Sequence, residues 1–266
     1  MQLSQEDTFE DYVIDGALGH GGSATVYRAH HADAPRHVVA LKVLDQRHHD
    51  EAHLSRLLRE FELARRARHP HVVTMYECGP CWLTMQLATG GTAMRLTSRR
   101  DRLTALAQVA GALDHVHATG VVHCDVKPSN ILVLEEFTIN GVILTDFGIA
   151  RSMTEDLGHR PKNVEASLPY AAPEVLRGHA PSAASDEYSL ACTAVEMITG
   201  ATPFRAPTAM ALISAQIDNP VPRYARRFDW IPHSFDSILA KAMAKDPDQR
   251  YQSCSEMIVL MTRSLR

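Results

Sequence analysis

The sequence predicts an α+β fold of two lobes, in which a small lobe built on an antiparallel β-sheet with one helix precedes a larger, mainly helical lobe. The first third of the chain is rich in short β-prone runs separated by turn residues, whereas apolar residues recur at helical spacing over most of the remainder. The Gly-rich connection Thr89-Gly90-Gly91 lies between these two parts. We therefore expect one domain over residues 1–266, with the small lobe and hinge over about 1–87 and the helical lobe over about 88–266.

The composition fits a folded protein and excludes several classes of function. Of the 266 residues, 45% are hydrophobic and 22% are charged, which is enough apolar material for a sizeable core. The net charge of -4 gives no electrostatic reason to expect a nucleic acid as partner. We expect neither a signal peptide nor membrane contact by this segment, because its start is polar and it lacks a run of about 18 apolar residues. Five scattered cysteines then predict reduced thiols in the cytoplasm, in a free protein or in the cytoplasmic domain of a membrane-anchored one.

The predicted small lobe contains five strands and one helix. Strands at 12–18 and 24–29 enclose a glycine-rich turn, and the apolar run at 38–44 suits a buried strand. Apolar residues at helical spacing predict a helix from about 50 to 68, where His69-Pro70 stops it. A hairpin follows, with strands at 72–76 and 82–87.

The tip of this hairpin carries the sequence Cys78-Gly79-Pro80-Cys81. The spacing of the two thiols suits a metal knuckle or a redox pair, but a second such pair is missing from the sequence. Gly-Pro is first of all a turn signal. We therefore interpret the segment as a turn with two bystander thiols, and the sequence does not decide whether they pair.

The predicted helical lobe begins with a helix whose apolar stripe, Leu103 to Leu113, ends before Gly120. Two short apolar strands follow at 131–134 and 142–145, and then a polar, irregular stretch at 151–167. The remainder, 185–265, is largely helical with breaks at prolines.

Three segments carry residues suited to phosphoryl transfer, which requires a protein to hold a triphosphate, neutralise its charge and aim the acceptor hydroxyl. The first is Leu18-Gly19-His20-Gly21-Gly22, whose glycines let backbone N–H groups approach phosphate oxygens. A dinucleotide-binding turn has similar glycines but requires a helix after them, and the β-prone Thr25-Val26-Tyr27 argues against that alternative.

The second segment is Val39-Ala40-Leu41-Lys42, which places one lysine on an otherwise apolar strand. A buried lysine is unfavourable unless an anion pairs with it. Lys42 is therefore either an edge-strand lysine that points to water or a phosphate ligand steadied by a carboxylate of the following helix. Glu60 and Glu62 both flank the apolar stripe of that helix, and periodicity alone does not choose between them.

The third segment is the loop 123–130, His-Cys-Asp-Val-Lys-Pro-Ser-Asn, which precedes Asp146-Phe147-Gly148. Asp125 could accept a hydroxyl proton, and Lys127 could neutralise the moving phosphate. Asn130 and Asp146 offer oxygen ligands for Mg²⁺. Each motif alone is a weak signal, but their order along the chain, each on a suitable element, is specific.

With these residues in view, the sequence resembles the protein kinase superfamily, and among its members the eukaryotic-like Ser/Thr kinases of bacteria. The resemblance covers about residues 12–261 and extends to Ala172-Pro173-Glu174, Asp186 and Arg250. It implies the bilobal protein kinase fold, with ATP and Mg²⁺ (or Mn²⁺) between the lobes. It also implies protein substrates with Ser or Thr acceptors, the enzyme itself among them, and a homodimer through the small lobe, as many members form.

The resemblance also implies roles for individual residues. Lys42 binds the α- and β-phosphates and pairs with Glu60, whereas Asp125 orients the acceptor hydroxyl beside Lys127. Glu174 and Arg250 form a structural ion pair, Asp186 braces the catalytic loop, and Asn130 and Asp146 hold the metal. The residues expected around the nucleotide, with the hinge at 86–88, are Leu18, Gly19, His20, Gly21, Gly22, Val26, Ala40, Lys42, Met85, Gln86, Ala88, Leu132 and Asp146.

The sequence departs from the family pattern at three places. Ala24 replaces the third glycine of the phosphate-binding turn, and Ala166-Ser167 replaces the usual Gly-Thr, although Ser167 keeps a hydroxyl that could bond Asp125 or Lys127. Cys124 stands where many members carry Arg, which makes the chain a non-RD type. Because a thiol cannot form a bidentate pair with phosphate, we expect catalysis not to require phosphorylation of Thr154.

Two other functions compete with an active protein kinase. A nucleotide-binding pseudokinase scaffold would be free to lose Lys42, Asp125 or Asp146, and all three are present. A small-molecule phosphotransferase of the antibiotic-kinase type would lack the elements that support a peptide groove, namely Ala172-Pro173-Glu174, Asp186 and Arg250. Both alternatives therefore rank below a protein Ser/Thr kinase.

Overall fold

The structure is a computed structural model that describes residues 3–152 and 165–266. Thr154 lies outside these described residues. The strands are β1 (Thr8–Phe9), β2 (Tyr12–His20), β3 (Ala24–His31), β4 (Ala34–Leu44), β5 (Met75–Cys78), β6 (Trp82–Gln86), β7 (Val121–Val122), β8 (Ile131–Val133), β9 (Val142–Leu144) and β10 (Arg151–Ser152). The α-helices are α1 (Glu51–Arg66), α2 (Arg99–Ala118), α3 (Phe137–Asn140), α4 (Pro173–Leu176), α5 (Ala183–Thr199), α6 (Ala209–Asp218), α7 (His233–Ala242) and α8 (Cys254–Ser264). The 3₁₀ helices are η1 (Gln46–His48), η2 (Ala93–Arg95), η3 (Pro128–Asn130), η4 (Glu165–Tyr170) and η5 (Pro247–Gln249).

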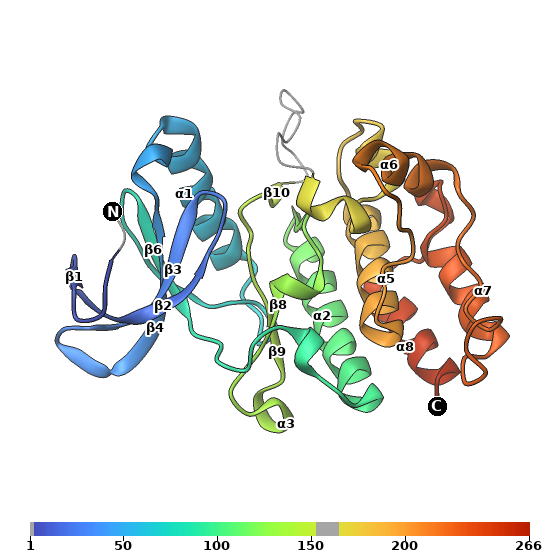
Figure 1. Ribbon diagram of the computed structural model, residues 1–266, viewed down its shortest axis with the longest axis horizontal. Coiled ribbons are helices and arrows are strands. Elements are labelled where there is room, and N and C mark those ends of the chain that lie inside the picture. Colours follow the sequence, from blue (N-terminus) through green and yellow to red (C-terminus); the bar gives the residue numbers. More distant parts are fainter. Residues whose placement is uncertain (1–2, 153–164) are drawn as a thin grey trace.

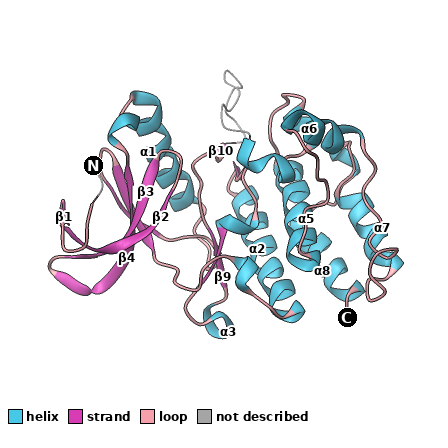
Figure 2. Ribbon diagram, viewed as in Figure 1, coloured by secondary structure: helices cyan, strands magenta, loops and turns pink. Residues whose placement is uncertain are grey.

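The molecule has two lobes, as the sequence predicts (Figure 1). Strands β1 to β6 form one antiparallel sheet in the order β1-β2-β3-β4-β6-β5, with α1 beside it. The helices α2 and α5 to α8 form the other lobe, and Figure 2 shows how strands gather at one end of the molecule and helices at the other. The short β8–β9 hairpin lies between the two groups of elements.

Helix α1 forms where the apolar spacing predicts it. Asp50 caps its first turn, because the carboxylate accepts a hydrogen bond from His53 N at 3.1 Å. Leu57 and Phe61 are buried in the same cluster as β4 and β6 residues, which fixes the face that the helix presents to the sheet. Glu60 lies on this face and is buried, whereas Glu62 is exposed. The structure thus selects the glutamate that periodicity left open.

The first strand of the expected hairpin is displaced from the prediction of 72–76, because β5 begins at Met75 and ends at Cys78. Val72 pairs in parallel with Leu144 instead, and Val73 N donates to Leu144 O at 2.9 Å. The apolar residues before Met75 therefore pack against the helical lobe, and antiparallel pairing with β6 begins only at β5. The turn that joins β5 to β6 is as predicted, since Gly79 N donates to Trp82 O and the thiols of Cys78 and Cys81 are free.

The helical lobe is organised around α2 and α5, which share one buried apolar cluster with α7 and α8. Leu106 and Leu113 of α2 and Leu190 of α5 are fully buried in it. Gly120 adopts a φ of +76° just after α2, a conformation that glycine adopts without strain. Among the described residues, no helix combines the length and the apolar composition needed to span a membrane.

The connection between the lobes is tied to the β8–β9 hairpin. Gly90 N donates to Val133 O at 2.9 Å, and Val133 N donates to Gly91 O at 2.8 Å. A Cβ atom on Gly90 would lie 2.8 Å from Val133 atoms, so the close approach of the two backbones requires glycine here.

Candidate active site

Lys42 of β4 and Glu60 of α1 form a buried ion pair. Lys42 Nζ lies 2.8 Å from Glu60 Oε1 and 2.7 Å from Oε2, and the glutamate side chain is only 3% exposed. Asp146, from the helical lobe, lies 3.8 Å from the same ammonium group. Burial lowers the pKa of Lys42, but the charges of Glu60 and Asp146 outweigh burial and raise that pKa above its ordinary value. The lysine is therefore cationic and faces the boundary between the lobes.

Asp125 lies at the centre of a hydrogen-bonded group in the loop after β7. Its Oδ2 accepts from Lys127 Nζ at 2.7 Å and from Asn130 Nδ2 at 3.0 Å, and its Oδ1 accepts from Ser167 Oγ at 2.5 Å. Ser167 Oγ also accepts from Lys127 Nζ at 3.0 Å. The hydroxyl of Ser167 thus bonds both Asp125 and Lys127, which the sequence offered as alternative partners. The carboxylate of Asp125 fixes the positions of all three neighbouring side chains.

Asp186 braces the backbone of the same loop from α5. It is fully buried, and its carboxylate accepts the N–H groups of His123 and Cys124, each at 2.8 Å. His117 Nε2 bonds the same carboxylate at 2.9 Å. Sequence reasoning expected the brace but missed His117, whose position three residues before Gly120 was its only signal.

The buried His123 ring ties the loop to the strand before Asp146. Asp125 N donates to His123 Nδ1 at 3.2 Å, so the ring proton is on Nε2, which donates to Thr145 O at 3.1 Å. The ring packs edge-on against Phe147 with centroids 4.7 Å apart. The His123 side chain therefore connects the loop that carries Asp125 to the segment that carries Asp146.

Asn130 and Asp146 present oxygen atoms suited to a divalent metal. Asn130 donates through Nδ2 to Asp125, which fixes the amide and leaves Oδ1 as its acceptor. The two residues are held together by a backbone bond from Thr145 N to Asn130 O at 2.9 Å. Burial raises the pKa of Asp146, but the charges of Lys42 and Lys127 outweigh burial and lower that pKa, so the carboxylate is ionised. An amide oxygen and a carboxylate are the ligands that hard cations prefer, and the donor set fits such an ion.

Among the described residues, two of the four non-glycine residues with positive φ lie at this site. Cys124 and Asp146 both adopt left-handed conformations, with φ of +67° and +66°. Such conformations cost about 1–3 kcal/mol in a non-glycine residue and tend to occur at functional sites. The Cys124 thiol contacts Val122 O at 3.5 Å, and burial raises its pKa well above the ordinary value, so the thiol is neutral. It cannot replace the cation that many kinases carry here.

One apolar cluster gathers the residues expected around a nucleotide base. Ala40 and Met85 are buried neighbours across the β4–β6 pairing. Val26, Ala88 and Leu132 pack against the same cluster from β3, the interlobe connection and β8. The apolar surfaces of both lobes therefore meet at the place where the sequence predicts the adenine.

The glycine-rich turn is closed by a backbone hydrogen bond and ends at Ala24, which belongs to the same apolar cluster. Gly21 N donates to Ala24 O at 2.8 Å, and the β2–β3 pairing continues up to His20 and Thr25. The exposed His20 bonds Thr25 Oγ1 at 2.8 Å. A hollow of about 700 Å³ separates the turn from the connection between β4 and α1.

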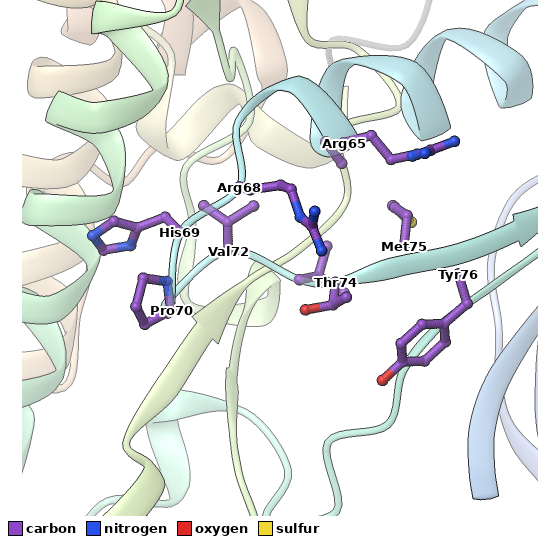
Figure 3. Close-up of a pocket in the computed structure, with 10 residues that line it drawn as sticks. Arg65, Arg68, His69, Pro70, Val72, Thr74, Met75 and Tyr76 are labelled. Carbon is purple, nitrogen blue, oxygen red and sulfur yellow. The ribbon is translucent and has the colours of Figure 1, made fainter.

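A second cavity, of about 370 Å³, lies away from these residues at the end of α1 (Figure 3). Arg65, Arg68 and His69 line one side of it, and Thr74 and Tyr76 line the other. None of the site residues predicted from the sequence borders it. The cavity therefore plays no part in assembling the groups described above.

Glu174 and Arg250 form a bidentate ion pair in the core of the helical lobe. The two contacts, Nη1 to Oε1 and Nη2 to Oε2, are each 2.7 Å long. Ser185 Oγ also donates to Glu174 at 2.9 Å. The pair ties α4, which follows the segment that carries Ser167, to the residue directly after η5.

One lobe carries the lysine–glutamate pair, and the other carries the aspartate–lysine group and two oxygen atoms suited to a metal. Such an arrangement is typical of a nucleotide-dependent phosphotransferase. A family model described as "Protein kinase domain" matches residues 12–259. The chain therefore belongs to the protein kinase family.

Relatives of known structure or name agree with this assignment. The serine/threonine-protein kinase PknJ of Mycobacterium tuberculosis is 37% identical over 268 residues, which cover 96% of this chain and 45% of PknJ. PknH of the same organism is 33% identical, over 97% of this chain and 42% of PknH. The chain thus spans less than half the length of these two relatives. The crystal structure of the Mycobacterium tuberculosis PknI kinase domain matches with a TM-score of 0.74 at 28% identity, over 99% of this chain and 100% of that one.

Proposed function

We propose that this domain transfers the γ-phosphate of ATP to Ser or Thr hydroxyls of proteins, its own chain among them. The observation that carries the proposal is the hydrogen-bonded group of Asp125, Lys127, Asn130 and Ser167. It combines a carboxylate that can accept a hydroxyl proton with a cation that can neutralise a phosphate in flight. The names of the serine/threonine-protein kinases PknJ and PknH support the same acceptor class.

Each side chain then has one task in the reaction. Lys42, held by Glu60, binds the α- and β-phosphates, and the glycine-rich turn covers them with backbone N–H groups. Asp125 orients the acceptor hydroxyl and receives its proton, while Lys127 stabilises the negative charge on the transferring group. Ser167 holds these two residues in register. Little covalent chemistry is asked of the protein, because positioning and charge account for most of the rate.

The nucleotide is proposed to sit between the lobes with its base in the apolar cluster around Ala40 and Met85. The contacts expected from the sequence remain proposals at Leu18, Gly19, His20, Gly21, Gly22, Val26, Gln86, Ala88 and Leu132. The family implies ATP and a divalent metal, and we propose Mg²⁺ at Asn130 and Asp146, with Mn²⁺ as a substitute. The ion supplies positive charge to the phosphates when it is bound.

A pseudokinase scaffold is the second candidate, and the geometry makes it the weaker one. Lys42 is already paired with Glu60, and Asp146 is ionised beside it. A scaffold has no need to keep both lobes in this arrangement. Incubation of the purified chain with labelled ATP and Mg²⁺, followed by mass spectrometry of the products, decides between them. Phosphorylated Ser or Thr in the chain or in an added acceptor protein is the expected result, and ATP binding without any transfer would identify a scaffold.

Three further expectations stay proposals. The lobe boundary is placed near residue 87, where β6 ends and the glycine-tethered connection begins. A homodimer through the small lobe is proposed by analogy with other family members. A cytoplasmic location is proposed because the reaction needs ATP and because all five thiols are free.

A further inference from the structure

Outside the active site, three side chains that bind transition metals converge where α2 meets the start of α8. Asp114 and His117 lie one turn apart on α2, and Cys254 is the first residue of α8. One ligand atom of each residue lies within 4.8 Å of the other two. In the described part of the chain, this is the one group of three or more such side chains that comes so close together.

The geometry and the chemistry of the group suit a tetrahedral zinc ion. Zinc binds thiolate, imidazole and carboxylate ligands at about 2.0–2.3 Å, which separates the ligand atoms by roughly 3.4 Å. Atoms at most 4.8 Å apart would have to approach by roughly 1.4 Å or less, which rotation of side chains can supply. A mixed set of one sulfur, one nitrogen and one oxygen also favours zinc over Mg²⁺ or Ca²⁺, which take oxygen ligands.

Both α2 ligands are already oriented by hydrogen bonds. His117 Nε2 bonds the buried carboxylate of Asp186 at 2.9 Å, which leaves Nδ1 as the nitrogen available to a metal. Metal-bound imidazoles usually make such a bond to a carboxylate through their second nitrogen. Asp114 accepts the N–H groups of Cys254 and Ser255 at 2.8 and 3.0 Å, and each of its oxygens keeps a second lone pair.

The local charge also favours a cation. Cys254 is 1% exposed, and its sulfur lies in the field of the carboxylates of Asp114 and Asp186. Asp186 is buried as well, at 0% exposure. A divalent ion would reduce the mutual repulsion of this negative charge. Capping of α8 explains Asp114, core packing explains Cys254, and the bond to Asp186 explains His117. None of these roles by itself requires that a thiol, an imidazole and a carboxylate converge.

We propose that Asp114, His117 and Cys254 bind one zinc ion, with water as the fourth ligand. Binding forms a sulfur–zinc bond and releases the thiol proton to solvent. The site is separate from the nucleotide metal at Asn130 and Asp146. Because Asp186 bonds both His117 and the catalytic-loop backbone, the ion would stiffen the support of that loop.

The test measures zinc retained by the tag-free, reduced, metal-stripped chain. The chain is incubated with a small excess of Zn²⁺ in the presence of abundant Mg²⁺ and ATP, which occupy the nucleotide site, and is then desalted. We expect about one zinc ion per chain by mass spectrometry, because the three side chains form a single site. Cys254→Ala should lose it, and the matched control Cys192→Ala, which removes another buried thiol of the helical lobe, should keep it.

A second readout separates metal binding from folding. Co²⁺ should give a thiolate-to-cobalt absorption band in the wild type and in Cys192→Ala, and none in Cys254→Ala. At 100-fold excess over the dissociation constant, Zn²⁺ should raise the melting temperature of the first two by about 5–10 °C. Equal melting temperatures of the metal-free wild type and metal-free Cys254→Ala would show that the variant is folded. If Cys254→Ala is unfolded, the test uses Asp114→Asn and the cobalt spectrum of the wild type instead.

Three results would overturn the proposal. The wild type could retain no zinc and show no thiolate-to-cobalt band. A folded Cys254→Ala chain could retain as much zinc as the wild type. The zinc could instead follow the hairpin thiols, so that a Cys78→Ala, Cys81→Ala double variant loses it while Cys254→Ala keeps it.

Discussion

Substitution of Asp125 by asparagine removes one negative charge and almost none of the local shape. The amide oxygen of an asparagine can still accept from Lys127 and Asn130, and its NH₂ group can donate to Ser167 Oγ. The neighbours of Asp125 are therefore kept, and they hold the new side chain where the carboxylate was. A loss of turnover in the variant can therefore be attributed to the missing charge and basicity of Asp125.

The structure predicts a small loss of stability and a large loss of turnover for Asp125→Asn. Lys127 Nζ, which donates to the charged carboxylate at 2.7 Å, would donate to a neutral amide oxygen in the variant. The weaker bond should reduce the free energy of unfolding by about 1 kcal/mol, which lowers the melting temperature by about 2–4 °C in a chain of this size. Loss of the group that accepts the proton should reduce turnover by about 10²–10⁴-fold, or roughly 3–5 kcal/mol. The dissociation constant of ATP should change by less than about threefold, because Asp125 contacts neither Lys42 nor the glycine-rich turn.

The assay compares phosphate transfer and calorimetric ATP binding on the same preparations. Asp248→Asn serves as the control, because Asp248 is an exposed carboxylate on η5 and its loss changes the net charge equally. The control should retain wild-type turnover. Turnover of the Asp125→Asn variant within about tenfold of the wild type would refute the role of Asp125.

Four further outcomes are expected. Lys42→Met should weaken ATP binding and reduce turnover by about 10²-fold or more, since a cation held at the phosphates is lost, and calorimetry with a transfer assay measures both effects. Chelation of divalent ions should abolish transfer, with recovery on addition of Mg²⁺; activity that survives chelation would contradict the metal assignment. Thr154→Ala and phosphatase-treated chains should keep most of their activity, because Cys124 offers no cation to a phosphate, and inactivity that reverses with Thr154 phosphorylation would show the opposite. Glu174→Gln should destabilise the domain by about 3–5 kcal/mol in denaturant titrations, because Arg250 is left buried with a neutral partner.

The ion pair of Glu174 and Arg250 also predicts how the free energy of unfolding depends on pH. Burial raises the pKa of Glu174, but the hydrogen bonds and charge of Arg250 outweigh burial and lower that pKa below the ordinary 4.5. A depressed pKa contributes stability that is fully present above about 4.5 and is lost as the pH falls through the folded value. The wild type should therefore lose stability below pH 4.5 more steeply than Glu174→Gln in urea titrations, and parallel pH profiles would contradict the pair.

The sequence by itself predicted most of the helices and strands and named the residues to which the proposed chemistry is assigned. Short β-prone and apolar runs predicted the strands of the sheet, and apolar residues at helical spacing predicted α1 and α2, because burial of a helix face follows directly from residue spacing. Motifs of short range, such as the loop 123–130, placed Asp125, Lys127 and Asn130 within one turn of backbone. Such local constellations need no knowledge of the remainder of the fold.

Tertiary structure alone decided the contacts between distant segments. Periodicity could not choose between Glu60 and Glu62, since both flank the apolar stripe. The choice was made by the face that α1 presents to the sheet, which carries Glu60 to Lys42. The same holds for Val72, which left its expected strand because pairing with β9 buries it. His117 was equally beyond the sequence, because its partner Asp186 lies 69 residues away. Burial and pairing across such separations depend on how the lobes and helices pack, and residue spacing along one element carries no information about that packing.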